Sequence, residues 1–421
     1  HVLQRSGRHV EALAVAGEVT TAAEQLGDEP LLVRARIRLG SLQDDAAAYE
    51  SAETTLTSAY ESALGQTMMA EAATAANLLT QLIGYKLARI DEGRWWLGTA
   101  RPLARAADSD DAQIGYYDNL GILSFMDGHY EAAREAFAAS LAIEEQVWGA
   151  DHPRIAGSLN NLGVVAALAG DDERARADFE GALRIYTATL GPEHPKVATT
   201  LNHLGGVESG EQARAHLERA LAIRERSLGP DHPEVASVLT TLAAQANDDG
   251  RLQDALDYQQ RALAIQERQL GSDHPDVAVS LCNLGLLALE LERFEEARAH
   301  FERALTIQER ELGPDHVALA GSLRGLGLAL LGLGVPAEAL PPLERAWTLA
   351  HAGERDPAML AAIEFALARA LWQAPAGSGG DPARARALAN AAETGFVDAG
   401  GEWAPELEAL RSWRAGLPED P

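Results

Sequence analysis

A five-residue phrase that returns at a nearly fixed interval constrains the fold of this chain more than any other feature. It reads Gly-Ala-Asp-His-Pro at 149–153, recurs at Gly191, Gly229 and Gly271, and is decayed at Gly313. Its successive histidines are separated by 42, 38, 42 and 42 residues. A fixed period of about 20 to 50 residues is typical of stacked supersecondary units. The sequence therefore predicts a solenoid that grows by adding units, so its 421 residues do not imply several globular domains.

The segments between these phrases share one template of two helices. The first helix ends in a Leu-Gly pair, and the second carries Ala, a bulky apolar residue four positions on and a small residue three after that. Leu162-Gly163, Ala175, Phe179 and Ala182 show the frame. Apolar residues at steps of three and four give each helix one apolar stripe, and small residues let two helices approach closely. With aromatics at only 5%, the template indicates an all-α class.

The small residues of the second helices give the number and regularity of the units. They lie at positions 12, 52, 93, 133, 175, 213, 255, 297, 339 and 385, which predicts about nine complete repeats after a leading half. Glycine recurs in the first helices at 121, 163, 205, 285 and 327, and its cost inside a helix suggests that nothing larger fits. Between Gly205 and Ala213 the spacing is 8 rather than 12, which predicts a missing helical turn and a local irregularity.

The connector phrase also has a structural interpretation. Its glycine suits a left-handed helix end, and its proline suits the first turn of the next helix. One histidine per repeat cannot form a metal site, because repeat layers stack at about 10 Å and metal ligands lie about 2 Å from one ion. The sequence contains no phosphate-binding glycine loop, kinase catalytic-loop motif or nucleophile elbow. We therefore expect no metal, no cofactor, no catalytic residues and no enzymatic activity in this chain.

Charge and cysteine content narrow the classes of partner. A net charge of −28 opposes binding to nucleic acid or to an anionic membrane, since both need clustered Lys and Arg. Cys282 is the single cysteine, which excludes an internal disulfide and fits a reducing compartment. No apolar run approaches the roughly 18 residues that span a bilayer. We expect a cytoplasmic location without direct membrane insertion, unless a segment upstream of His1 places the protein elsewhere, because Leu3 to Gly7 read as the tail of a longer helix.

The template residues resemble the tetratricopeptide repeat, and the 42-residue period with its Gly-x-Asp-His-Pro connector resembles the kinesin light chain subtype. The resemblance implies an all-α, right-handed superhelical solenoid of helix-turn-helix repeats. Along the chain we expect degenerate N-terminal repeats with a truncated first one (1–106), regular repeats (107–350), a last irregular repeat with a capping helix (351–416) and a disordered tail (417–421).

The resemblance also suggests where a ligand would bind. In tetratricopeptide repeats the first helices line the concave face, and the positions before the Leu-Gly pair point into the groove. The predicted ligand-binding residues are Asn119, Asn160, Asn161, Asn202, His203, Thr241 and Asn283. An amide donates and accepts at once, which suits an extended peptide backbone. The alternative is that some of these asparagines only bond to adjacent repeats. Because first helices such as 155–170 and 277–289 carry almost no charge, we expect an uncharged or mildly basic ligand segment.

A narrower likeness concerns residues 81–93, 365–372 and 383–392. They resemble the C-terminal repeat region of large serine/threonine protein kinases of myxobacteria, in which the catalytic domain lies upstream. This implies a protein-interaction or scaffolding module that serves as the regulatory or substrate-docking tail of a bacterial kinase. The alternative is a free-standing adaptor, or the sensor region of a nucleotide-binding signalling ATPase or caspase-like protease. The partner protein and the oligomeric state stay open.

Overall fold

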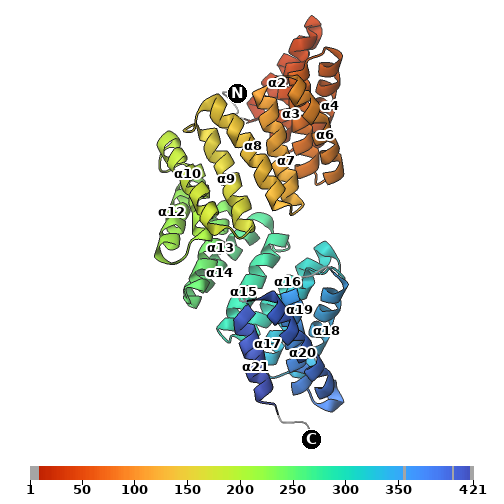
Figure 1. Cartoon of the computed structure of the whole chain (residues 1–421), viewed down its shortest axis with the longest axis vertical. Coiled ribbons are helices and arrows are strands. Elements are labelled where there is room, and N and C mark those ends of the chain that lie inside the picture. Colours follow the sequence, from red (N-terminus) through yellow and green to blue (C-terminus); the bar gives the residue numbers. More distant parts are fainter. Residues whose placement is uncertain (1–8, 354–356, 401–402, 418–421) are drawn as a thin grey trace. The chain divides into compact units, whose positions relative to one another are not determined.

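The computed structural model describes residues 9–353, 357–400 and 403–417, and every regular element in these ranges is helical (Figure 1). The chain divides into two compact units, residues 1–208 (unit 1) and 209–421 (unit 2). Unit 1 contains α2 (His9–Leu26), α3 (Glu29–Asp45), α4 (Tyr49–Gly65), α5 (Met69–Leu79), the π-helix η1 (Thr80–Lys86), α6 (Ile90–Ala106), α7 (Asp110–Met126), α8 (Tyr130–Trp148), α9 (Pro153–Leu168), α10 (Asp172–Leu190) and α11 (Pro195–Val207). Unit 2 contains α12 (Gly210–Leu228), α13 (Pro233–Asp248), α14 (Leu252–Leu270), α15 (Pro275–Glu290), α16 (Phe294–Leu312), α17 (Leu319–Gly332), α18 (Pro336–Ala352), α19 (Pro357–Gln373), the short 3₁₀ helix η2 (Ala376–Ser378), α20 (Pro382–Ala399) and α21 (Ala404–Ala415).

Each unit is a stack of helix hairpins. In unit 1 the hairpins are α3/α4, α5–η1/α6, α7/α8 and α9/α10, and in unit 2 they are α13/α14, α15/α16, α17/α18 and α19/α20. The first helices of successive hairpins also touch, as α5 touches α7 and α15 touches α17. The predicted all-α fold of stacked helix-turn-helix repeats is confirmed. The last described helix, α21, packs on α20 and buries Leu410, and its role as a cap stays a prediction.

Not every predicted boundary can be compared with the structure. Residues 1–8 and 418–421, which hold the truncated start and most of the expected tail, lie outside the described residues. The division of the chain at 106 and 350 stays a prediction. The irregularity near Gly210 is confirmed in the length of α11, which has 13 residues, whereas α9 and α13 have 16. Unit 1 ends directly after this shortened helix.

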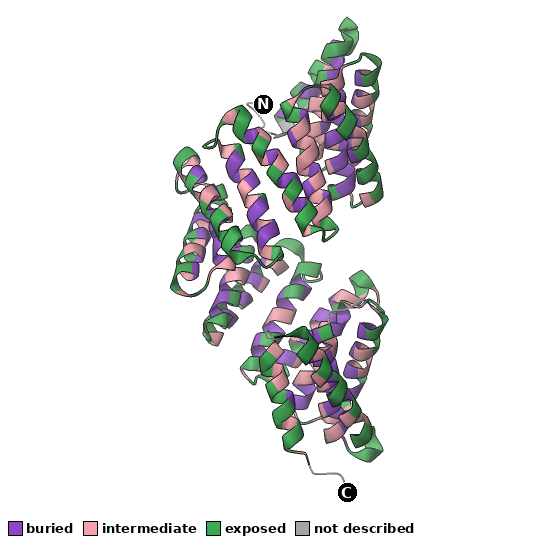
Figure 2. Ribbon diagram, in the orientation of Figure 1, coloured by how far each residue is buried: buried purple, intermediate pink, exposed green. Residues whose placement is uncertain are grey.

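The recurring glycines lie where two helices of a hairpin cross. A Cβ atom added to Gly121 would lie 2.6 Å from the ring of Phe137, and one added to Gly163 would lie 2.5 Å from the ring of Phe179. Buried residues form stripes along the facing sides of the paired helices, and exposed residues cover the outside (Figure 2). The expectation that nothing larger fits at these positions is therefore confirmed for the glycines whose surroundings are described. We call a glycine of this kind together with the phenylalanine that covers it a Gly–Phe pair.

Replacing Ala175 with leucine is expected to lower the free energy of unfolding by about 1–3 kcal/mol, because extra methylene groups at a closed helix crossing force neighbours apart. Ala175 is 0% exposed and packs with Phe179 and Leu204. Chemical denaturation followed by circular dichroism measures the change. Ala177 lies exposed on the same helix, so Ala177→Leu is the matched control. An unchanged midpoint for Ala175→Leu contradicts this account of the crossing.

The connector phrase ends one helix and begins the next. Its glycines have φ between 79° and 91°, and Gly191 has ψ 157°, so the backbone is extended at positive φ rather than left-handed helical as predicted. This region is essentially restricted to glycine. The Nδ1 atom of the following histidine accepts the backbone N–H two residues on at 3.2–3.3 Å in all five copies of the phrase. In the first four copies the histidine is the N-cap of the next helix, whereas His316 lies just before the start of α17 at Leu319. The histidines therefore have a structural role.

Removing one histidine cap is expected to cost about 1 kcal/mol, the usual value of an N-cap side chain. His232→Ala leaves the N–H of Glu234 without its 3.2 Å acceptor, whereas His232→Asn keeps a side-chain acceptor at the same place. Denaturation of the two variants measures the difference. Equal losses in both variants show that the imidazole contributes by packing and not as a cap.

Candidate functional site

The first helices of unit 1 enclose a groove of about 960 Å³, which we call the unit 1 groove. Its described lining comes from α3, α5, η1, α7 and α9, each of which is the first helix of its hairpin or continues it. The lining residues are Arg34, Ile37, Arg38, Ser41, Thr74, Asn77, Leu78, Gln81, Asp111, Gly115, Asp118, Asn119, Ile122, Arg154 and Asn161. The groove thus combines amides, hydroxyls and charged groups over a floor with a few aliphatic side chains.

The charged side chains of this groove largely have partners within the protein. Arg34 pairs with Glu71 at 2.8 Å, and Nη1 of Arg154 lies 3.5 Å from a carboxylate oxygen of Asp111. The guanidinium of Arg154 also lies 4.3 Å from the centre of the Trp148 ring. A stacked and paired guanidinium is held in one place. The groove therefore presents fixed charges of both signs and no strong field of one sign.

Asp118 is the titratable group of the groove with the most altered environment. Burial raises the pKa of Asp118 from 3.8 to about 6, against the hydrogen bond that Ser140 Oγ donates to its carboxylate at 2.6 Å. Glu144 adds to the increase in pKa and Arg154 opposes it. The carboxyl of Asp118 therefore changes its charge in a mildly acidic range, which alters the electrostatics of the groove there.

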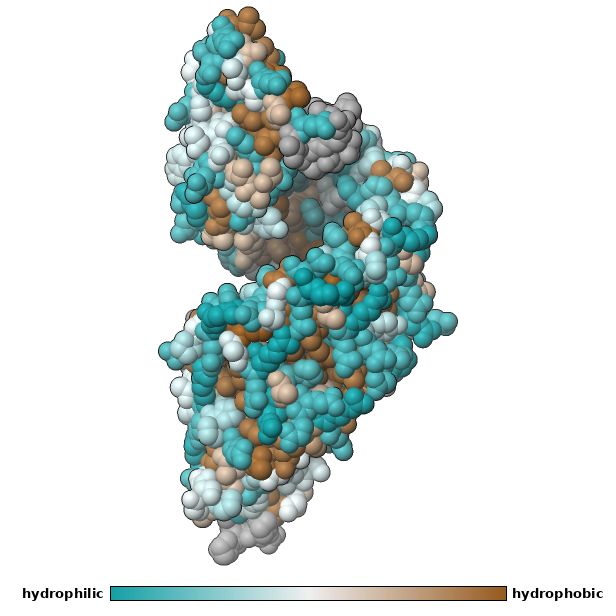
Figure 3. All heavy atoms as spheres, turned by 180° about the vertical axis from the view of Figure 1, so that it is seen from behind, coloured by the Kyte–Doolittle hydropathy of each residue, from teal (hydrophilic) through white to brown (hydrophobic). Residues whose placement is uncertain are grey.

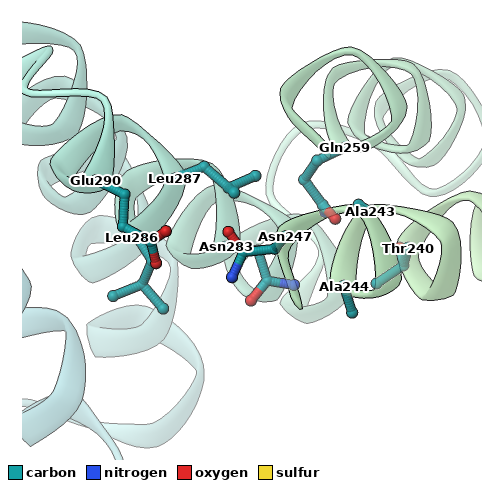
Figure 4. A pocket seen from close by; sticks show the side chains of 9 residues that line it. All are labelled: Thr240, Ala243, Ala244, Asn247, Gln259, Asn283, Leu286, Leu287 and Glu290. Carbon is teal, nitrogen blue, oxygen red and sulfur yellow. The ribbon is translucent and has the colours of Figure 1, made fainter. Parts of the chain in front are cut away.

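Unit 2 has a smaller pocket of about 240 Å³ between α13, α14 and α15, which we call the unit 2 pocket. It is lined by Thr240, Ala243, Ala244, Asn247, Gln259, Asn283, Leu286, Leu287 and Glu290 (Figure 4). Asn247 and Asn283 extend into it from two first helices, and Gln259 reaches it from the second helix α14 (Figure 4). Amide groups from three helices thus converge on an otherwise aliphatic pocket.

The structure distributes the seven predicted ligand-binding residues over different environments. Asn119 and Asn161 line the unit 1 groove, and Asn283 lines the unit 2 pocket. Asn119 is 6% exposed, and its amide donates to the carbonyl of Asn77 at 2.9 Å. Asn161 is exposed. Of these three residues, Asn161 and Asn283 are therefore the ones whose amides a ligand can reach.

The other predicted residues line neither of these two pockets among the described residues. The amide of Asn160 donates to Thr200 Oγ1 of the next first helix at 3.0 Å, which is the alternative role considered for these asparagines. The ring of His203 lies 5.1 Å from that of Phe179, and Asn202 precedes it on α11. Thr241 donates to the carbonyl of Ser237 within its own helix. Their part in ligand binding stays a prediction.

Residues that were not among the predicted site residues contribute much of both pockets. Arg34 and Arg154 bring charge into the unit 1 groove, which the nearly uncharged first helices of later repeats did not indicate. Asp118 also brings charge, and it stands at one of the template positions before the Leu-Gly pair. Gln259 stands where the template has a bulky apolar residue, and Ala243 stands where it has glycine. Both departures from the template can be found in the sequence alone, by comparing the repeats position by position.

The face of the molecule drawn in Figure 3 is mainly hydrophilic, with hydrophobic residues between the hydrophilic ones. Ion pairs join successive second helices in unit 2, such as Arg303 with Glu267 and Arg345 with Glu309. No group of His, Cys, Asp and Glu suited to a metal ion occurs among the described residues. None of the helices in the described part of the chain is long and apolar enough to cross a membrane.

Comparison with known proteins identifies the repeats. One sequence model of the tetratricopeptide repeat matches residues 111–187, 154–210, 235–310 and 281–350, and a second matches 197–234. No curated protein matches the chain significantly. These repeat matches cover more than half of the sequence and include the first helices α7 and α9 of the unit 1 groove and all of the unit 2 pocket.

The solved structures of two proteins show the same fold at low sequence identity. The apo form of the quorum sensor NprR from B. thuringiensis is 14% identical with a TM-score of 0.58, over 85% of this chain and 98% of that one. A Rap protein complexed with competence and sporulation factor is 15% identical with a TM-score of 0.57, over 91% and 98%. TPR-like repeats described as those of a kinesin light chain from Podosopora anserina are 25% identical with a TM-score of 0.43, over 48% and 99%. The template, the hairpins and the matched repeats together show that this chain belongs to the tetratricopeptide repeat family.

Proposed function

We propose that this chain binds an extended segment of a partner protein along the first helices of its repeats. The tetratricopeptide array is a scaffold for protein–protein interaction. The observation that carries the proposal is that Asn161 and Asn283, from the same template position in different repeats, line the unit 1 groove and the unit 2 pocket. Amides at repeated positions can donate to and accept from an extended backbone.

The charges of the unit 1 groove indicate the kind of segment. Arg34 is paired with Glu71 and Arg154 with Asp111, so a ligand that brings a strong net charge would have to compete with existing ion pairs. An uncharged or mildly basic segment would leave these pairs intact, and Ile37, Leu78 and Ile122 offer it aliphatic contacts. This agrees with the ligand expected from the nearly uncharged first helices.

The solved structures with the same fold are compatible with this proposal. The Rap structure holds a protein of this architecture in complex with competence and sporulation factor, and NprR is described as a quorum sensor. At 14–15% identity these likenesses extend to the fold alone. They support only the idea that a solenoid of this length can serve as a receptor for another molecule.

Substitution of Asn161 in the unit 1 groove and Asn283 in the unit 2 pocket tests the proposal. A display library of short random peptides is selected on the wild-type chain, and the binding of the selected peptides is then measured for Asn161→Ala/Asn283→Ala. Loss of two hydrogen-bonding amides is expected to weaken binding by about tenfold to a hundredfold. Asn390→Ala, at an exposed position of the second helix α20, is the control and should bind as wild type does. Full binding by the groove variant would falsify the assignment.

We further propose that this module is the regulatory or substrate-docking tail of a serine/threonine protein kinase. The proposal rests on the resemblance of residues 81–93, 365–372 and 383–392 to kinase C-terminal repeat regions. The first of these stretches is also structurally distinctive, because it includes most of the π-helix η1 and the close approach of Gly84 to Gly93.

Sequencing of the coding DNA upstream of His1 tests the kinase proposal directly. A glycine-rich ATP loop followed by a His-Arg-Asp motif supports a docking tail, and the next experiment then concerns the substrates of that kinase. A start codon within one repeat length contradicts it and favours a free-standing adaptor. A nucleotide-binding ATPase or a caspase-like domain upstream favours the sensor alternative.

A further inference from the structure

The hairpin α13/α14 of unit 2 lacks the Gly–Phe pair that closes the next hairpin, α15/α16. In the hairpin α15/α16, Phe301 covers Gly285, and a Cβ atom on that glycine would lie 2.7 Å from the ring. The equivalent residues of α13/α14 are Ala243 and Gln259, with the same separation of 16 residues along the chain. A buried aromatic ring is thus replaced by a carboxamide, and the glycine beneath it by alanine.

The two exchanged residues lie in the wall of the unit 2 pocket. Ala243 and Gln259 both line it, and so does Asn283 of the next first helix. The equivalent of Asn283 one repeat later is Gly325, which lies against the ring of Phe301. Gln259 is 1% exposed, yet its Nε2 atom has no hydrogen-bond partner among the described residues. In Figure 4 its side chain extends from α14 towards α13 and into the pocket.

A second side-chain amide in the pocket lining also has a buried atom without a hydrogen-bond partner among the described residues. Asn247, also in the pocket lining, has an Oδ1 atom that is buried without a hydrogen-bond partner in the described part of the chain. In the next hairpin the equivalent residue is Leu289, which packs against Phe301 and its neighbours. Buried polar groups in proteins are nearly always hydrogen-bonded, and leaving them unpaired is unfavourable. Two such amides in one pocket point to a ligand that completes them.

The lining defines the chemistry of that ligand. Gln259 offers an N–H donor and Asn247 a carbonyl acceptor, so the matching group must both accept and donate. A carboxamide does so whichever way the two protein amides are turned. A carboxylate would have no proton for the Asn247 acceptor and would lie near Glu290, whereas an ammonium would have no acceptor for Gln259. Leu286 and Leu287 provide aliphatic walls for the methylene groups that precede the amide.

We propose that the unit 2 pocket binds the carboxamide of a glutamine or asparagine side chain of the partner segment. This inference rests on the proposed function, since the side chain belongs to the peptide bound along the first helices. Asn283 supplies the link, because it stands at the template position of Asn161 and is part of the pocket wall. The pocket therefore selects one side chain of a segment bound along the first helices of unit 2.

A small probe tests the pocket without any peptide. Butyramide carries the carboxamide on an aliphatic stem, and methyl propyl ketone replaces its NH₂ with a methyl group. Ligand-observed NMR with the full chain is expected to detect butyramide binding about tenfold stronger than that of the ketone. In Ala243→Gly/Gln259→Phe, which rebuilds the Gly–Phe pair of the next hairpin, butyramide binding is expected to fall by about tenfold as well.

The double variant is designed to remain folded, and circular dichroism with a thermal midpoint at or above that of wild type verifies this. Gln259→Leu provides a second variant, because Leu343 occupies this position in the hairpin α17/α18. Equal butyramide signals from the wild type and from either folded variant overturn the inference. Equal binding of butyramide and the ketone by the wild type also overturns it.

Peptide selection separates this inference from the proposed function. Peptides selected on the wild type should share glutamine or asparagine at one position, and selection on Ala243→Gly/Gln259→Phe should lose that preference. Selected peptides that bind without such a preference overturn the carboxamide pocket and leave the groove proposal intact. If no peptide binds, the proposed function fails, and the pocket fails with it as a peptide subsite.

Discussion

Replacing Phe301 with alanine is expected to lower the free energy of unfolding of unit 2 by about 3–5 kcal/mol, the usual cost of removing a buried aromatic ring. Phe301 is 1% exposed and packs with Ala288, Ala297 and Ala329. Its ring also lies against Gly285 and Gly325 on two successive first helices, so the cavity would open between two repeats. Chemical denaturation followed by far-ultraviolet circular dichroism measures the loss.

Gln259→Ala is the matched control for this experiment, because Gln259 occupies the same template position one repeat earlier. Its removal deletes an amide whose Nε2 atom has no partner among the described residues, so we expect a change of less than about 1 kcal/mol. Similar losses for Phe301→Ala and Gln259→Ala would contradict the view that the Gly–Phe pair stabilises the hairpins and that the α13/α14 hairpin lacks it.

The stability of unit 1 is expected to decrease as the pH rises from about 4 to about 6, through the titration of Asp118. Its pKa is raised by burial from 3.8 to about 6, so between these values the folded state binds a proton that the unfolded state has released. The contribution to stability is complete below the lower value and is lost above the higher one. A shift of this size corresponds to about 3 kcal/mol, which partial solvent screening reduces to about 2 kcal/mol.

The variant Asp118→Asn isolates this effect. Its amide oxygen can still accept from Ser140 but does not titrate. The free energy of unfolding of the variant minus that of wild type should therefore be about 2 kcal/mol larger at pH 7 than near pH 4. Denaturation followed by tryptophan fluorescence measures the difference, and Trp148, which stacks on Arg154 near this carboxyl, is one of the reporting residues. A difference between variant and wild type that does not change with pH rules out the raised pKa.

The repeat architecture could be predicted from the sequence because it depends on short-range steric requirements. The pairing of Gly163 with Phe179 is visible at a fixed spacing, and the ring can cover the first helix this closely because glycine has no side chain. The shortening of α11 followed from counting residues between Gly205 and Ala213. The exact backbone of Gly191 did not follow, because both positive-φ conformations satisfy the same sequence signal.

The role of each asparagine could not be predicted, because it depends on contacts between repeats. Asn119 and Asn161 occupy the same template position, but Asn119 finds the carbonyl of Asn77, just before the π-helix η1, within hydrogen-bond distance. Asn160 finds the hydroxyl of Thr200, a partner defined only by how two first helices are stacked. Sequence position identifies which face of a helix a residue occupies, whereas its partner depends on the neighbouring helix.

The capping histidines give this molecule a built-in set of spectroscopic reporters. Because Nδ1 accepts a backbone N–H in every copy of the phrase, each imidazole is held in the tautomer that carries its proton on Nε2. When a helix frays at its start, that hydrogen bond breaks and the tautomer is released. Imidazole nitrogen resonances at residues 152, 194, 232, 274 and 316 would therefore report, repeat by repeat, the order in which the array comes apart.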